Sequence, residues 1–143
     1  MLDVAFIACA LVSATVVVHV VGVSVLLRSI LNVHSRLPTH VWPIIRLVVG
    51  LTLALILLHA IEIAIWALFF LWAECLPDAE SAFYFSGVTY ATVGYGDVVL
   101  PQPWRLLGPL EGLTGILMCG LSTGFFFAVF SRILGARLKI EPQ

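Results

Sequence analysis

Residues Thr92-Val93-Gly94-Tyr95-Gly96-Asp97 decide how this chain folds. Two glycines alternate with residues that carry side chains, and glycine adopts positive φ without strain. When successive residues alternate in handedness, consecutive carbonyl groups point to the same side, which an ordinary β-strand does not allow. The stretch therefore predicts an irregular segment with a row of carbonyl oxygens along one edge.

A short helix is predicted just before this stretch. Asp78-Ala79-Glu80-Ser81 places acidic residues where a helix begins, next to the positive end of its dipole. A helix over 79–91 is about 20 Å long, which is too short to cross a bilayer but long enough to dip halfway. Pro101 and Trp104 then mark the return of the chain.

The composition of the chain indicates a membrane protein. Of its 143 residues, 62% are hydrophobic and 10% charged, and the mean hydropathy is +1.13. Soluble domains carry about 25% charged residues, so lipid must cover most of this surface. The net charge of -1 argues against nucleic acid as a partner. The three cysteines show no metal-ligand spacing.

Three apolar stretches are long enough to cross a bilayer, which takes about 20 residues; they are Val4–Leu27, Leu47–Trp72 and Leu106–Ile133. Six of the seven basic residues flank the link between the first two stretches or follow the third; they are Arg28, Arg36, Arg46, Arg132, Arg137 and Lys139. Because basic residues mark cytoplasmic segments, we expect the N-terminus and residues 73–105 outside and the C-terminus inside. The start of the chain lacks a positive n-region, so we expect the first span to be retained.

Non-helical backbone at membrane depth must be buried in protein or line a water-filled cavity. Four carbonyl rows around one axis form oxygen cages that replace the water shell of a monovalent cation. The stretch 92–97 resembles the signature filter of potassium channels, and the helix, pore helix, filter and helix over roughly 47–133 resemble their pore domain. The resemblance implies K⁺ coordination by the carbonyls of Thr92, Val93, Gly94 and Tyr95 and by the Thr92 hydroxyl, with Gly96 and Asp97 completing the outer mouth.

The expected fold is therefore an all-α membrane protein, a fourfold symmetric homotetramer in lipid with three transmembrane helices and a re-entrant pore helix per chain. We divide the chain into an extra N-terminal helix (1–31), a cytoplasmic linker (32–46), a pore domain (47–134) and a short cytoplasmic tail (135–143). Within the pore domain we expect an outer helix (47–72), the pore helix (79–91), the filter (92–97) and an inner helix (106–133). Such a chain conducts K⁺ passively and needs no cofactor, and we expect it in a prokaryotic plasma membrane.

The filter surroundings depart from the family pattern at two positions. Ala91 replaces the second threonine of many relatives, and Val88 stands where some carry a glutamate that partners the filter aspartate. Asp97 therefore needs another partner, and we predict the Tyr84 hydroxyl. Phe83, Tyr84 and Phe85, with Trp66 below them, can form an aromatic cuff that braces Tyr95; simple core packing is the alternative, and the two are compatible.

Two acidic residues lie within the apolar spans. Glu62 should face protein rather than lipid, because a charge at that depth is costly. Either it is neutral or hydrogen-bonded to the pore helix, for example at Ser86 or Thr89, or it titrates with His59 and makes conduction depend on pH. Glu111 either supports the filter from behind or attracts cations near the mouth.

The inner helix should line the pore through a face that carries Thr114, Met118, Ser122 and Phe126. Gly115, Gly120 and Gly124 are candidate hinges, although close helix packing explains any of them equally well. A phenylalanine at 126, 127 or 130 is a candidate hydrophobic constriction.

Other functions fit the sequence less well. Potassium transporters resemble four pore repeats in one chain with degenerate filters, whereas this chain has one intact filter. No enzyme motif such as Gly-x-Ser-x-Gly or His-Glu-x-x-His occurs, so we do not expect an enzyme. A non-conducting or regulatory subunit of a potassium transport system remains the alternative. No span carries the regularly spaced arginines of a voltage sensor.

Overall fold

The computed structural model describes residues 2–33 and 41–138, and in these ranges the chain is all-helical. The helices are α1 (Leu2–Val33), α2 (Val41–Trp72), α3 (Ala79–Tyr90), the one-turn 3-10 helix η1 (Gln102–Trp104) and α4 (Leu107–Leu138). Three segments are long and apolar enough to cross a membrane, namely Leu2–Leu31, Trp42–Trp72 and Gln102–Ile133. The three spans expected from hydropathy are thus confirmed as helices.

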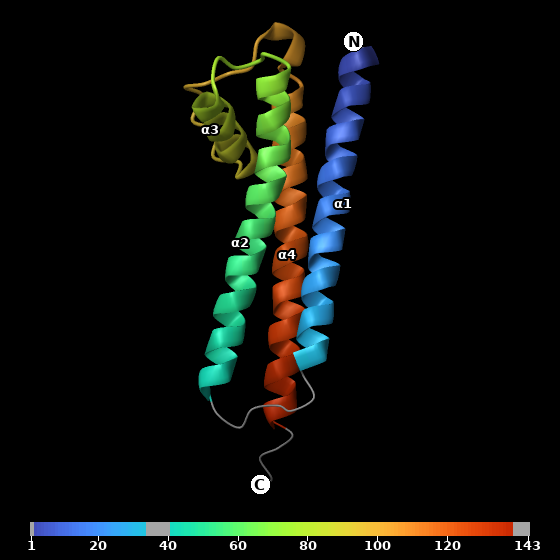
Figure 1. Cartoon of the computed structure of the whole chain (residues 1–143), viewed down its shortest axis with the longest axis vertical. Coiled ribbons are helices and arrows are strands. Elements are labelled where there is room, and N and C mark those ends of the chain that lie inside the picture. The colour runs from blue at the N-terminus through green and yellow to red at the C-terminus, as the bar shows by residue number, and fades with distance from the viewer. Residues whose placement is uncertain (1, 34–40, 139–143) are drawn as a thin grey trace.

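The long helices run alongside one another, and α3 packs against α2 and α4 near one end of the bundle (Figure 1). The N-terminal end of α1 lies at that same end, and the C-terminal end of α4 lies at the opposite one (Figure 1). The segment around α3 and the start of α1 therefore share one end of the molecule, as the basic residues predicted. Which side of the membrane this end faces stays a prediction.

The largest differences from the predicted helix boundaries are at the start of α2 and the end of α4. Helix α2 begins at Val41 rather than 47, since Pro43 sits in the first turn, where a helix needs no backbone donor. Helix α4 continues to Leu138, through part of the predicted tail. With α1 ending at Val33, the link between the first two spans is shorter than 32–46. Its centre, with Arg36, and the chain end, with Lys139, lie outside the described residues.

Helix α1 contacts α2 through one stripe of small and polar residues. The Trp66 indole donates a hydrogen bond to the Thr15 hydroxyl at 3.0 Å. Two turns further along, a Cβ on Gly22 would lie 2.5 Å from a methyl group of Leu58. The small residues at these two contacts let α1 approach α2 closely, so the extra helix is a packed part of the subunit.

Apolar packing forms two clusters, one at each end of the bundle. The cluster beside α3 joins α1, α2, α3 and the start of α4; its fully buried members are Trp66, Ala67, Phe70, Ala82 and Leu107. The cluster at the other end joins α2 and α4 through Leu51, Leu55, Val129 and Ile133. The first cluster holds the short helix α3 against the long ones and so fixes where the chain turns after it.

The ends of α3 are defined by local hydrogen bonds. Asp78 caps its start, accepting from the Ser81 backbone N–H at 2.8 Å and from the Ser81 hydroxyl at 3.0 Å. These bonds hold the pKa of the exposed Asp78 carboxyl below its usual range. The helix start predicted from the acidic residues at 78–81 is confirmed.

Candidate functional site

The C-terminal end of α3 turns the chain sharply into the segment 92–97. The backbone N–H of Thr92 donates to the Thr89 carbonyl at 2.9 Å, and that of Val93 donates to the Val88 carbonyl at 2.8 Å. This pair of bonds is a Schellman motif, with Thr92 at the left-handed position (φ +58°) that glycine usually occupies. A β-branched residue is strained in this conformation, so the surrounding structure must hold it there.

Left-handed backbone recurs at every second residue of the segment. After Thr92, Gly94 has φ +55° and Gly96 has φ +79°, whereas Val93 and Tyr95 between them do not have positive φ. A Cβ on either glycine would meet nothing within 4 Å, so the conformation rather than space requires glycine here. The alternating handedness predicted from the sequence is present, and it extends to Thr92.

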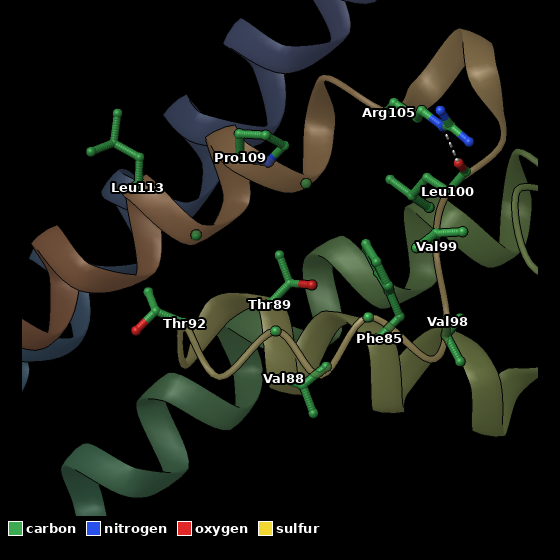
Figure 2. Close-up of a pocket in the computed structure, with 14 residues that line it drawn as sticks. Phe85, Val88, Thr89, Thr92, Val98, Val99, Leu100, Arg105, Pro109 and Leu113 are labelled. Carbon is green, nitrogen blue, oxygen red and sulfur yellow. Dashed lines mark hydrogen bonds between the residues drawn. The ribbon is translucent and has the colours of Figure 1, made fainter.

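The segment 92–97 is exposed along one side of the subunit. Val93 is 51% and Tyr95 71% exposed, although both are large apolar or aromatic residues. A hollow of about 660 Å³ lies beside the segment, α3 and the start of α4, and its walls include Thr92, Gly94 and Leu113. In Figure 2 the Thr89 and Phe85 side chains point from α3 toward the α4 side of this hollow, and Val88 points away. One chain alone therefore leaves the segment uncovered.

The outer end of the segment is tied to α3. The Tyr84 hydroxyl donates to the Asp97 carboxylate at 2.7 Å, as the missing glutamate at 88 led us to predict. The Val98 backbone N–H donates to the other oxygen of the same carboxylate at 3.1 Å. The Tyr84 hydrogen bond lowers the pKa of Asp97, and the same contact raises the pKa of Tyr84.

The start of the segment is tied to a buried polar cluster. Glu62 is fully buried on α2, and one of its oxygens lies 2.9 Å from Nδ1 of His19 on α1. The other oxygen lies 3.1 Å from Nδ1 of His59 and accepts a hydrogen bond from the hydroxyl of Tyr90, the last residue of α3. Glu62 does bind the pore helix, but at Tyr90 rather than at Ser86 or Thr89 as expected.

A second buried carboxylate, Glu111 on α4, holds the middle of α3. Its Oε1 accepts a hydrogen bond from the Ser86 hydroxyl, which also lies 2.9 Å from the Ile63 carbonyl of α2. Among the described residues, the Oε2 of Glu111 has no hydrogen-bond partner. Of the two placements considered for Glu111, the structure thus shows the one behind the pore helix.

Of the four residues considered for an aromatic cuff around Tyr95, Trp66 packs elsewhere, and contact of the other three with Tyr95 stays a prediction. Trp66 is fully buried and directs its indole N–H to Thr15 of α1, away from the segment 92–97. Phe85 packs edge-on against Phe70, with ring centroids 5.4 Å apart. Phe83 and Tyr84 are about two-fifths exposed, at 42% and 40%. Trp66 braces the extra helix instead, because α1 covers this face of α2.

The prediction of which face of α4 lines a pore is also wrong. Thr114, Met118 and Ser122 are only 4–5% exposed, because they pack inside their own subunit. Phe126 is half-buried in the apolar cluster at the far end. At 100° per residue, the side of α4 opposite Met118 carries other residues; the exposed ones are Ile116, Gly120, Thr123 and Phe127.

Gly115 is a close-packing residue. A Cβ there would lie 2.1 Å from the Tyr90 carbonyl oxygen, and one on Gly112 would lie 3.3 Å from that of Thr89. These two glycines let α4 touch the backbone at the end of α3. Gly120 and Gly124 have nothing within 4 Å and lie in an unbroken helix, and their role as hinges stays a prediction.

Sequence reasoning missed two participants in this site, His19 and Tyr90. His19 interrupts the first apolar stretch, and a histidine at mid-span signals a polar partner in the bundle. Tyr90 stands next to the filter with a hydroxyl that needs a partner when buried, and Glu62 is the acceptor.

The comparisons with known proteins agree with this geometry. The family described as Ion_trans_2, ion channel, matches residues 55–132, which cover most of α2, all of α3, the segment 92–97 and most of α4. Searches of curated proteins and of solved structures gave no match. Because the matched region makes up more than half of the chain, this multi-pass membrane protein belongs to the ion channel family of the potassium-channel pore type, a family of channels rather than enzymes.

Proposed function

We propose that four copies of this chain assemble around the segment 92–97 and conduct K⁺ selectively and passively. The observation that carries the proposal is the alternation of left-handed backbone at Thr92, Gly94 and Gly96, just after a short helix that packs against the long helices α2 and α4. Such backbone can direct the carbonyls of Thr92, Val93, Gly94 and Tyr95 toward one axis. Four such rows would supply the oxygen cages that replace the hydration shell of K⁺.

The exposed filter supports fourfold assembly. A single subunit leaves Val93 and Tyr95 uncovered and a hollow open beside them. Fourfold closure around the carbonyl rows would cover these surfaces with neighbouring subunits, because homo-oligomers close by rotational symmetry. The inner cavity would then be lined by the exposed side of α4, with Ile116, Gly120 and Thr123 below the filter. Phe127 is the candidate for a constriction on that side.

The basic residues support an orientation with the N-terminus outside and the C-terminal end of α4 in the cytoplasm. The location proposed for the protein, a prokaryotic plasma membrane, rests on the family resemblance alone. In this orientation Asp97 and Tyr84 face the outside solution, where K⁺ enters or leaves the filter. Helix α3 would point its C-terminal end, the negative end of its dipole, at the central cavity.

The test is K⁺ flux into liposomes that contain the purified protein, with Na⁺ as competitor and Ba²⁺ as blocker. We expect K⁺-selective flux that Ba²⁺ blocks and that Gly94→Ala abolishes, because alanine is strained at φ +55°. Gly50→Ala is the matched control: a Cβ there also meets nothing within 4 Å, but the residue is helical. Absence of flux from an intact tetramer would favour a non-conducting, regulatory subunit.

A further inference from the structure

Three metal-ligating side chains meet between α1 and α2. They are His19, His59 and Glu62, and one potential ligand atom of each lies within 4.8 Å of the other two. The distances from each histidine to the glutamate are shorter: His19 Nδ1 is 2.9 Å from Glu62 Oε1, and His59 Nδ1 is 3.1 Å from Glu62 Oε2. The two imidazole rings lie 5.6 Å apart between centroids and are tilted by 34°.

The two contacts with Glu62 have the spacing of ligands on one small cation, and the remaining separations, up to 4.8 Å, must shorten when the ion binds. Zn²⁺ binds imidazole nitrogen and carboxylate oxygen at about 2.0–2.2 Å, which puts neighbouring ligand atoms about 3.3 Å apart in a tetrahedral site. Two imidazoles and one carboxylate are a set preferred by borderline metals such as Zn²⁺, Cu²⁺ and Ni²⁺, whereas Mg²⁺ and Ca²⁺ prefer oxygen alone. The Tyr90 hydroxyl, 3.1 Å from His59 Nδ1, or a water molecule can complete the fourth position.

The tautomer of His19 is compatible with metal binding. Its Nε2 is buried and has no hydrogen-bond partner among the described residues. No contact on that nitrogen therefore forces the proton onto Nδ1. Without a metal, a proton on Nδ1 donates to the carboxylate oxygen 2.9 Å away; with the proton on Nε2, the Nδ1 lone pair and that oxygen face each other as two ligands for one cation.

An ion can approach this cluster from one side. His59 is 18% exposed and lines a cavity of about 370 Å³ between α2 and α4. The wall from α4 carries Cys119, Ser122 and Thr123, so polar side chains accompany the ion up to the imidazole. His19 and Glu62 lie deeper and are fully enclosed, at 1% and 0% exposure.

We propose that His19, His59 and Glu62 form a binding site for a divalent transition metal ion of the Zn²⁺ class that clamps the extra helix α1 to the pore unit. A metal bound there takes the carboxylate that otherwise accepts from Tyr90, and Tyr90 is two residues from Thr92. Zn²⁺ should therefore change K⁺ flux as well as bind; this functional consequence, unlike the binding, rests on the proposed function.

Binding is tested on the full-length chain in detergent. Of the four histidines, His34 and His40 fall outside the described residues, so the background carries His34→Gln and His40→Gln to remove them as possible ligands. Equilibrium dialysis against buffered Zn²⁺ should give one ion per chain. His19→Gln and His59→Gln should each weaken binding beyond the roughly 10–100-fold loss typical of supporting residues. Cys119→Ser, which changes a ligand-type side chain of the adjacent cavity, should leave it unchanged.

A second measurement needs no change within the cluster. Zinc-edge X-ray absorption on the same background chain should show only nitrogen and oxygen ligands at about 2.0–2.2 Å, with imidazole scattering. Failure of the background chain to retain zinc would overturn the site. So would a zinc affinity of His19→Gln and His59→Gln equal to that of the background chain, or a shell of sulfur ligands at about 2.3 Å. If the protein binds zinc as expected but never conducts K⁺, the proposed function fails and the site stands.

Discussion

The two buried carboxylates on either side of α3 are held in opposite ways. Glu62 has three side-chain partners on α1, α2 and α3, and both of its oxygens are used. Among the described residues, Glu111 has one side-chain partner, Ser86, and its second oxygen has none. On the Glu111 side, close backbone contact at Gly115 replaces hydrogen bonds. The end of the pore helix is thus fastened by polar contacts toward α1 and α2 and by packing toward α4.

This difference predicts that Glu62→Leu has the largest effect on stability. The change strands His19, His59 and Tyr90 without their shared partner, and breaking a buried charged network by removing one member costs about 3–5 kcal/mol. Thermal unfolding in detergent, followed by the loss of assembled protein, should show a clear decrease in the unfolding temperature. Ile61→Leu, the exposed neighbour on the same helix, is the control. Equal stability of the two variants would contradict the polar fastening.

Gly115→Ala should come next and tests the packed side. The new Cβ would lie 2.1 Å from the Tyr90 carbonyl oxygen, so α3 and α4 must separate, at a cost of about 1–3 kcal/mol. Gly124→Ala on the same helix meets nothing within 4 Å and should be neutral or slightly stabilising. The measurement is the same unfolding experiment together with K⁺ flux. If Gly124→Ala were the more harmful change, a hinge would explain the glycines better than packing.

Glu111→Gln should cost less than the same change at Glu62. The glutamine carbonyl can still accept from Ser86, and the second oxygen of Glu111 has no partner to lose in the part of the chain that the structure describes. We expect a loss below about 1.5 kcal/mol, the range of a single hydrogen bond. Glu62→Gln removes an acceptor that two imidazoles and the Tyr90 hydroxyl share, so it should be the more destabilised variant. A reversed order of the two unfolding temperatures would show that Glu111 carries the greater role.

The smallest effect on stability is expected from Tyr84→Phe, at the exposed outer mouth. Because the folded state lowers the pKa of Asp97, the contribution of this contact is complete above the ordinary aspartate pKa and is lost as pH falls through the lowered value. Removing the hydroxyl should move the pKa of Asp97 back toward about 3.9, so K⁺ flux should begin to fall at a higher external pH than in the unchanged protein. Flux measured against external pH is the test. In an Asp97→Asn background the shift should vanish, and a shift that persists there would assign it to another group.

The sequence predicted those parts of the fold that local chemistry determines. Three apolar stretches, the Asp78 cap and the alternating glycines at 94 and 96 each have a local physical cause, and the structure agrees with them. The partner of Asp97 was also predictable, since Tyr84 lies on the same short helix and Val88 cannot accept or donate. Helix ends were predicted less accurately, as the start of α2 at Val41, with Pro43 in its first turn, shows.

The contacts between helices could not be predicted in the same way. Helix α4 is apolar nearly all round, so its spacing pattern did not distinguish the face that packs on α2 from the opposite one, and Met118 was assigned to the wrong side. His19 and Tyr90 joined Glu62 only because three helices meet there, and no local pattern encodes that meeting. The left-handed conformation of Thr92 could not be predicted from the sequence either, because a threonine adopts it only when the surrounding structure imposes it.

The reversal potential across a planar bilayer tests the central claim most directly, with K⁺ on one side of the membrane, Na⁺ on the other and the purified assembly inserted between them. Carbonyl cages at residues 92–95 predict a reversal potential close to that of a membrane permeable to K⁺ alone, and its loss in Gly94→Ala. Currents that reverse near zero, showing no preference for K⁺ over Na⁺ in an intact fourfold assembly, would contradict the account.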